Sequence, residues 1–342
     1  MNAELRRLLV EAGYALAGSR DAEGRILVIN NQGSIPPSRD VPRDFAQKGF
    51  KLLLLGENGK PTHFARCGAT DDHALAREGE ILERLCRVPS LERTVPHTRT
   101  ARSSMLQVQL NAYIAGRLYQ QSFGRRSPRR WQEEVAEIME VRWHVSTQAA
   151  ATMPKLLVGG PLVRLVDEAG PQLAKLRESG VASRDIVAVE QALADGGELP
   201  RVLQHGDLWP GNVIRAGGSW WLIDFAEFAQ VQVPMYDLFH MLQYNPGRTR
   251  ADTRHAWFTF GEGAIQDQWT AASRAIVHGH AKKRGYQPSQ VGAALVHYLV
   301  HISAYRLREG VLRQYGEMYV KELSRVAGEL RRGASLGSLV GY

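Results

Sequence analysis

The chain has 342 residues, enough for two domains or for one domain with two lobes, and 44% of them are hydrophobic, which supplies a sizeable core. Its two cysteines, Cys67 and Cys86, are too few for a disulfide framework and are typical of a reducing cytosol, so we expect a cytoplasmic protein. Lys and Arg outnumber Asp and Glu by 43 to 35, which gives a net charge of +8. Such an excess fits nucleic acid, an anionic membrane surface or an anionic small substrate as a partner.

The N-terminal part is predicted to form a helix, a short strand over residues 25–29 and a polar loop. Residues 1–18 have apolar positions interrupted by charges such as Glu4 and Arg7, which indicates an amphipathic helix and not a signal peptide. No apolar run in the chain approaches the ~20 residues of a membrane span. In the loop, the backbone N–H groups of Gly33-Ser34 either approach a phosphate or belong to an ordinary surface turn.

A β-hairpin and a helix are predicted next. Residues 50–55 and 62–67 form two strands around an Asn58-Gly59 turn signal. The helix covers residues 74–86, with an aspartate at position 71 or 72 as its cap and leucines at helical spacing toward the core.

The middle of the chain adds two strands, over residues 95–101 and 105–110, and then mostly helices. Four arginines at positions 125, 126, 129 and 130 are interpreted as a solvated basic loop. Further helices are predicted over residues 131–148, 170–178, 186–194, 235–243, 257–282, 291–309 and 319–332.

The residues most indicative of chemistry lie between Leu203 and Phe225. The pattern is His-x-Asp-x-x-x-x-Asn, then a hairpin at Gly217-Gly218, then an apolar run that ends in Asp. Metal-assisted phosphoryl transfer needs such oxygen-bearing groups, because Mg²⁺ prefers carboxylate and other oxygen ligands. We therefore predict Asp207 as the base that faces an acceptor hydroxyl, and Asn212 and Asp224 as the ligands of Mg²⁺.

These residues resemble the catalytic core of the aminoglycoside phosphotransferase and choline kinase group, small-molecule kinases with a protein-kinase-like fold. The resemblance rests on His205, Asp207 and Asn212, on Ile223-Asp224-Phe225, and on Pro234-x-x-Asp237-Leu238-Phe239. It implies that Asp207 is the catalytic base and that His205 and Asp237 are structural, Asp237 bracing the catalytic loop from a helix start.

The resemblance also implies roles for residues nearer the N-terminus. In the family a lysine of the small lobe binds the nucleotide phosphates and pairs with a helix glutamate; here the strand offers Arg66, and Glu78 is its expected partner. Backbone groups around Gln109 to Asn111 would hydrogen-bond the nucleotide base, unless this segment is a plain edge strand and turn. A family-like G-x-G-x-x-G loop is missing from the sequence.

The resemblance implies a two-lobed α+β kinase-like fold. We expect a small antiparallel-sheet lobe over residues 1–110 and a mostly helical lobe over residues 111–342, with ATP or GTP and Mg²⁺ in the cleft. The expected reaction transfers the γ-phosphoryl group to a hydroxyl of a small molecule. A sugar or glycoconjugate is the first expectation for the acceptor, because His205-Gly-Asp-Leu-Trp209 resembles fructosamine-type sugar kinases.

Two alternatives stay open. One is a catalytically inactive kinase-like protein that binds nucleotide or serves as a scaffold, which Arg66 and the missing glycine-rich loop favour. The other is a nucleic-acid-binding protein, prompted by the charge. That alternative lacks the basic stripe with interleaved aromatics and the recognition helix that it would need, so we expect no nucleic acid as a partner. The sequence leaves the oligomeric state undetermined.

Overall fold

The computed structural model describes residues 3–14, 26–29, 50–121, 126–246, 268–308 and 313–342. It is an α+β structure that divides into two compact units. Unit 1 consists of residues 1–117 and 213–227, and unit 2 of residues 118–212 and 228–342. The predicted lobes, 1–110 and 111–342, stay a prediction about domains; in the compact units, the hairpin segment 213–227 groups with the N-terminal residues.

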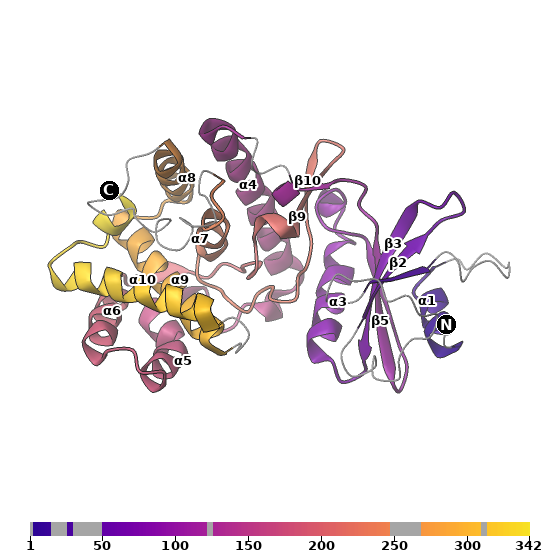
Figure 1. The fold of residues 1–342 in the computed structure, drawn as a ribbon, viewed down its shortest axis with the longest axis horizontal. Helices are drawn as coiled ribbons and strands as arrows, with labels where there is room; N and C mark the ends of the chain where they lie inside the picture. Colours follow the sequence, from indigo (N-terminus) through magenta and orange to yellow (C-terminus); the bar gives the residue numbers. More distant parts are fainter. Residues whose placement is uncertain (1–2, 15–25, 30–49, 122–125, 247–267, 309–312) are drawn as a thin grey trace. The chain divides into compact units, whose positions relative to one another are not determined.

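Unit 1 is built on a five-stranded antiparallel sheet in the order β1-β2-β3-β5-β4. Figure 1 shows helix α1 on one side of this sheet and helix α3 on the other. The elements are α1 (Ala3–Glu11), β1 (Ile26–Ile29), β2 (Phe50–Leu55), β3 (Pro61–Ala69), α3 (His73–Leu85), β4 (Thr98–Arg102) and β5 (Leu106–Ala112).

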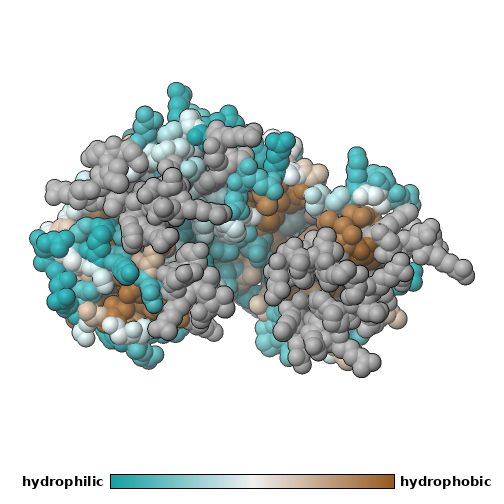
Figure 2. All heavy atoms as spheres, viewed as in Figure 1, coloured by the Kyte–Doolittle hydropathy of each residue, from teal (hydrophilic) through white to brown (hydrophobic). Residues whose placement is uncertain are grey.

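The two faces of this sheet differ because side chains alternate along each strand. One face packs its apolar residues against Leu5, Leu8 and Leu9 of α1 to form a buried core. The other face carries Arg66 and the side chains opposite it in neighbouring strands, and α3 packs against its β4–β5 side. Figure 2 shows hydrophobic surface over strands β2 and β3, where hydrophobic side chains such as Phe64 are only half buried.

Helix α3 begins where the sequence predicts a cap. The carboxylate of Asp72 accepts a hydrogen bond from the backbone N–H of Leu75 at 3.0 Å, which satisfies one free donor of the first turn. Leu75, Leu82 and Leu85 are buried, so the predicted core-facing side of the helix is confirmed.

A second hairpin completes unit 1. Strands β9 (Val213–Ala216) and β10 (Ser219–Leu222) pair antiparallel, with Val213 opposite Leu222, and the short β6 (Arg117–Leu118) joins them in a three-stranded sheet. Gly217 and Gly218 both have positive φ, 55° and 79°, as a tight hairpin turn requires. The predicted hairpin is thus confirmed, and its two strands begin and end beside predicted metal ligands.

Unit 2 is mostly helical. Helices α9 and α10 pack along each other, as Figure 1 shows, and α5 and α6 pack against α9. The elements are α4 (Pro128–Thr152), β7 (Leu162–Arg164), α5 (Leu165–Glu178), α6 (Ser183–Asp195), β8 (Glu198–Pro200), α7 (Tyr236–Leu242), α8 (Gln268–Arg284), α9 (Pro288–Arg308) and α10 (Arg313–Arg331). Short 3-10 turns at Pro89–Leu91, Pro154–Leu156, Pro210–Asn212 and Ser338–Val340 complete the described elements.

Several predicted element bounds differ from the structure. Helices α4, α5 and α10 begin three to six residues before their predicted starts, which sequence periodicity alone did not locate. The predicted strand 95–101 is β4, which begins only at Thr98. Gly33-Ser34, Arg125 and the first part of the predicted helix 257–282 lie outside the described residues.

Candidate active site

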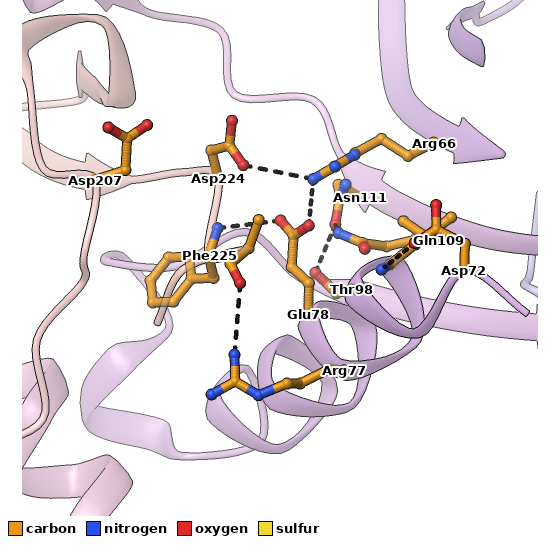
Figure 3. A network of polar contacts seen from close by, with 12 residues as sticks. Arg66, Asp72, Arg77, Glu78, Thr98, Gln109, Asn111, Asp207, Asp224 and Phe225 are labelled. Atoms are coloured by element: carbon orange, nitrogen blue, oxygen red, sulfur yellow. Dashed lines mark hydrogen bonds and ion pairs between the residues drawn. The ribbon is translucent and has the colours of Figure 1, made fainter. Parts of the chain in front are cut away.

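Arg66, Glu78 and Asp224 meet within unit 1. Figure 3 shows the Arg66 guanidinium between the two carboxylates. Its Nη1 forms an ion pair with Glu78 Oε2 and lies 3.5 Å from Asp224 Oδ1. The predicted partnership of Arg66 and Glu78 is therefore present as a contact, and the strand, the capped helix and the segment after β10 each supply one of the three charges.

Glu78 is almost completely buried, whereas the Asp224 side chain is 43% exposed. Burial raises the pKa of Glu78 above its ordinary value, and the charge of Asp224 acts in the same direction. The Arg66 charge and a hydrogen bond from the Phe225 backbone N–H, 3.1 Å from Oε1, oppose this shift. Glu78 thus connects Arg66 of β3 to the backbone N–H of Phe225, the residue after Asp224. The Asp224 carboxylate itself remains accessible.

The backbone at Asp224 adopts a less common conformation. Its φ is 63°, in the left-handed region that residues other than Gly, Asn and Asp rarely adopt. The flanking backbone is held by α3: Phe225 donates to Glu78, and Arg77 Nη1 donates to the carbonyl of Ala226 at 3.4 Å. Such a conformation persists where its surroundings impose it, and it is common at sites of function.

Gln109 and Asn111 lie in β5, the strand next to β3, and Gln109 is opposite Arg66. Their side chains are buried: the Asn111 Oδ1 accepts hydrogen bonds from Thr98 Oγ1 at 2.8 Å and from Gln109 Nε2 at 3.2 Å. Strand β5 is paired with β3 on one side and with β4 on the other through this stretch. The ladder therefore already engages the backbone groups predicted to bind a base. Just beyond it, the Tyr113 N–H donates to the Thr62 carbonyl at 2.8 Å and the Gly116 N–H to the Ile114 carbonyl at 2.9 Å.

In unit 2 the carboxylate of Asp237 organises the loop that precedes Asp207. It accepts hydrogen bonds from the backbone N–H groups of His205 at 2.7 Å and Gly206 at 2.9 Å. The Nε of Arg142, from α4, donates to the same carboxylate at 2.6 Å, and both side chains are buried. Gly206 has a φ of +87°, which lets two successive N–H groups converge on one carboxylate.

Both oxygens of Asp207 are engaged. Oδ2 accepts a hydrogen bond from Asn212 Nδ2 at 3.0 Å, and the same Nδ2 donates to the Asp207 carbonyl at 2.9 Å. Oδ1 lies 3.1 Å from Nε2 of His240. Burial acts to raise the pKa of Asp207, but the hydrogen bond from His240 and the charges of His240, His205 and Arg306 outweigh it, so the pKa lies below its ordinary value.

His240 is the residue that sequence reasoning missed. It lies on α7, three residues after Asp237, in a position that the pattern of the resembled family does not single out. Its neighbour Asp207 is 33 residues away in the chain, so no local sequence signal indicates their contact.

The predicted metal ligands, Asn212 and Asp224, offer side-chain oxygen atoms. Among the residues that the structure describes, no group of three or more His, Cys, Asp or Glu side chains could hold a metal ion. Asn212 and Asp224 nevertheless fit the demands of Mg²⁺, which takes one or two protein oxygens and completes its shell with water and phosphate. The Asn212 amide nitrogen donates to two oxygens of Asp207, so its Oδ1 is the atom that could bind a metal.

Of the helices within the described ranges, none is both long enough and apolar enough to cross a membrane.

Comparisons with known proteins identify the fold and the family. No curated protein sequence matches the chain significantly. Among solved structures, the ADP-bound aminoglycoside phosphotransferase APH(2'')-Ib has a TM-score of 0.54 and 15% identity, covering 96% of this chain and 99% of its own. Ethanolamine kinase from Plasmodium vivax has a TM-score of 0.55 and 13% identity, covering 93% and 88%. A glucosamine kinase has a TM-score of 0.50 and 15% identity, covering 89% and 81%.

At these identities the solved structures show a shared fold, which confirms the predicted α+β, protein-kinase-like class with a small antiparallel sheet and a mostly helical remainder. Residues 15–272, well over half of the chain, match the phosphotransferase enzyme family. The chain therefore belongs to the phosphotransferase enzyme family and is a phosphotransferase with an alcohol group as acceptor.

Proposed function

We propose that the protein transfers the γ-phosphoryl group of ATP or GTP, with Mg²⁺, to a hydroxyl group of a small molecule. The single observation that supports this most is the Asp207 carboxylate, which is fixed at both oxygens yet has a 36% exposed side chain. A carboxylate held in this way orients an acceptor hydroxyl, and orientation is the main task of the protein in phosphoryl transfer.

Asp207 then serves as the base. The acceptor oxygen forms a bond to phosphorus as the bond from phosphorus to the nucleoside diphosphate breaks, and the hydroxyl proton passes to Asp207. The lowered pKa keeps Asp207 ionised at neutral pH and makes it a weak base. A weak base suits a loose transition state, in which the proton leaves late.

Asn212 and Asp224 hold the metal in this proposal. The hairpin register supports it: Val213 is opposite Leu222, so Asn212 and Ile223 leave the hairpin at the same end, and Asp224 follows directly. When bound, Mg²⁺ would neutralise charge on the phosphate oxygens. His205 and Asp237 shape the loop: Asp237 through its two backbone bonds and Arg142, and His205 through its own backbone N–H.

Arg66 contacts the nucleotide phosphates in this proposal, and Glu78 orients it. The planar guanidinium can bond two phosphate oxygens at once. The sheet face that carries Arg66 also carries Phe64 and Leu53, which pair across β3 and β2 and are half buried. We assign the base to this apolar surface and its backbone contacts to Ile114 and Ala115, with Gln109 and Asn111 supporting Glu78 and β4 from within the sheet.

The acceptor class is a sugar or glycoconjugate in this proposal. The His205-Gly-Asp-Leu-Trp209 stretch resembles fructosamine-type kinases, and the fold is similar to that of a glucosamine kinase. The net charge of +8 favours a neutral or anionic acceptor over a polycationic one.

Phosphoryl transfer can be followed by ³¹P NMR with MgATP or MgGTP and a panel of sugars, amino sugars and amino alcohols. We expect a phosphomonoester signal with at least one sugar. The Asp207→Asn variant should bind nucleotide normally and lower turnover by roughly 10²–10⁴, the usual worth of a general base. Asp195→Asn, at an exposed aspartate of α6, is the matched control. Equal turnover in Asp207→Asn and wild type would show that Asp207 is not the base.

A further inference from the structure

A buried chain of hydrogen bonds begins at Asp207 and crosses three helices of unit 2. The first member is His240 of α7, whose Nε2 lies 3.1 Å from Asp207 Oδ1. Its Nδ1 lies 3.1 Å from the hydroxyl of Tyr298 on α9 and 2.8 Å from Nε2 of Gln243. The hydroxyl of Tyr319, on α10, donates to the Gln243 carbonyl oxygen.

This series of hydrogen bonds fixes the position of the proton on the His240 ring. Because Tyr319 donates to the carbonyl oxygen of Gln243, the amide NH₂ of Gln243 must face His240. An amide NH₂ group only donates, so His240 Nδ1 accepts. The ring proton is then on Nε2, where it is directed at Asp207 Oδ1.

The ring cannot turn away easily. His240 is 1% exposed, and Tyr298, Gln243 and Tyr319 are all buried. The ring of Tyr236 stacks on it with an interplanar angle of 8°, and Tyr298 meets it at 61°. Packing on these sides holds the imidazole in one rotamer, so its Nε2–H is a rigid donor.

We propose that His240 is a positioning residue for phosphoryl transfer, its Nε2–H holding Oδ1 of Asp207 while Asn212 holds Oδ2. This inference rests on the proposed function, in which Asp207 receives the acceptor proton as the new oxygen–phosphorus bond forms and the bond to the leaving diphosphate breaks. His240 keeps its own proton throughout. With both oxygens bound, the carboxylate plane is fixed, and the remaining lone pairs are directed for the acceptor hydroxyl.

Hydrolysis of MgATP, with water as the acceptor, tests the proposal in His240→Leu and His240→Gln. Leucine fills similar space without a donor, whereas the glutamine amide places an N–H close to the position of Nε2. We expect His240→Leu to lower kcat by about 10- to 100-fold with the KM for MgATP unchanged, as for other residues that orient a reacting group. His240→Gln should recover most of that loss. His280→Gln, at a buried histidine of α8, is the matched control and should retain wild-type kcat.

A second measurement does not depend on activity. ¹⁵N NMR of histidine-labelled wild-type protein reports the tautomer, and the His240 signal is assigned by its loss in His240→Gln. We expect the His240 proton on Nε2, with Nδ1 as an acceptor. A proton on Nδ1, or wild-type kcat in folded His240→Leu, would overturn the positioning role alone. A wild-type protein that neither binds nor hydrolyses MgATP would overturn the proposed function and this inference with it.

Discussion

Arg66 stands where the resembled family has a lysine, and the structure shows what the larger cation does there. Its guanidinium pairs with the buried Glu78 and also reaches Asp224. An ammonium group has one charged centre, whereas the guanidinium presents several donors in a fixed plane. Arg66 can therefore keep its contact with Glu78 and still present an N–H to a second oxygen, so the substitution is compatible with phosphate binding.

Removing this cation should destabilise unit 1. In Arg66→Met, Glu78 is left buried without its partner, and we expect a loss of about 3–5 kcal/mol in the free energy of unfolding. Urea denaturation monitors the change. Glu78→Gln in the Arg66→Met background should recover part of the loss, because no buried charge then remains. Equal stability of Arg66→Met and wild type would show that the pair contributes nothing.

At the scale of elements, helix α7 connects the fold to the candidate active site. Its first turn carries Asp237, which holds the loop before Asp207, and its next turn carries His240, which contacts Asp207 itself. One short helix therefore sets both the backbone and the side chain of the proposed base. Arg142 of α4 and Tyr298 of α9 attach this helix to the rest of unit 2.

Asp237→Asn tests the first of these links. The amide would place an NH₂ group against the Arg142 guanidinium or the loop N–H groups, which are donors already. We expect a loss of about 3–5 kcal/mol in stability, measured by thermal and urea unfolding, because a buried charge loses its partner. Asp167→Asn, in the exposed first turn of α5, should change stability by no more than about 0.5 kcal/mol. A loss no larger than that of the control would contradict the role of Asp237.

Prediction from sequence succeeded where the signals are local. The Asp72 cap and the Gly217-Gly218 hairpin depend on residues a few positions apart, and both occur as predicted. The pairing of β5 on both sides and the contact of His240 with Asp207 depend on segments distant in the chain. Periodicity and turn signals carry no information about such contacts, so the sequence did not indicate that Gln109 and Asn111 are paired on both sides, and His240 was not assigned.

At the scale of the whole molecule, histidines of α8 and α9 make the stability depend on pH. Burial lowers the pKa of His280 to about 4, of His297 to about 3 and of His301 to about 4, from an ordinary value of 6.5. As pH falls from 6.5 toward 4, the unfolded chain binds protons that the folded chain does not. Stability is therefore lost in this window, by about 1.4 kcal/mol per pH unit for each histidine.

Urea denaturation at pH 7.5, 6.5, 5.5 and 5.0 measures this loss. We expect a loss of about 1 kcal/mol between pH 7.5 and 6.5, where the unfolded histidines become half protonated, and a steeper fall below 6.5. His297→Gln should make the fall shallower, because glutamine does not titrate. A stability that stays constant from pH 6.5 to 5.0 would contradict the burial of these rings as neutral groups.

The central claim is that Asp224 belongs to a Mg²⁺-dependent nucleotide site. Isothermal titration of ATP and of GTP, each with and without Mg²⁺, into wild type and Asp224→Ala tests it most directly, with the exposed Glu57→Ala as a control variant. We expect metal-dependent binding in wild type and Glu57→Ala that is lost in Asp224→Ala. Unchanged metal-dependent affinity in Asp224→Ala would contradict the proposed metal site, and no binding of either nucleotide to wild type would contradict the kinase function.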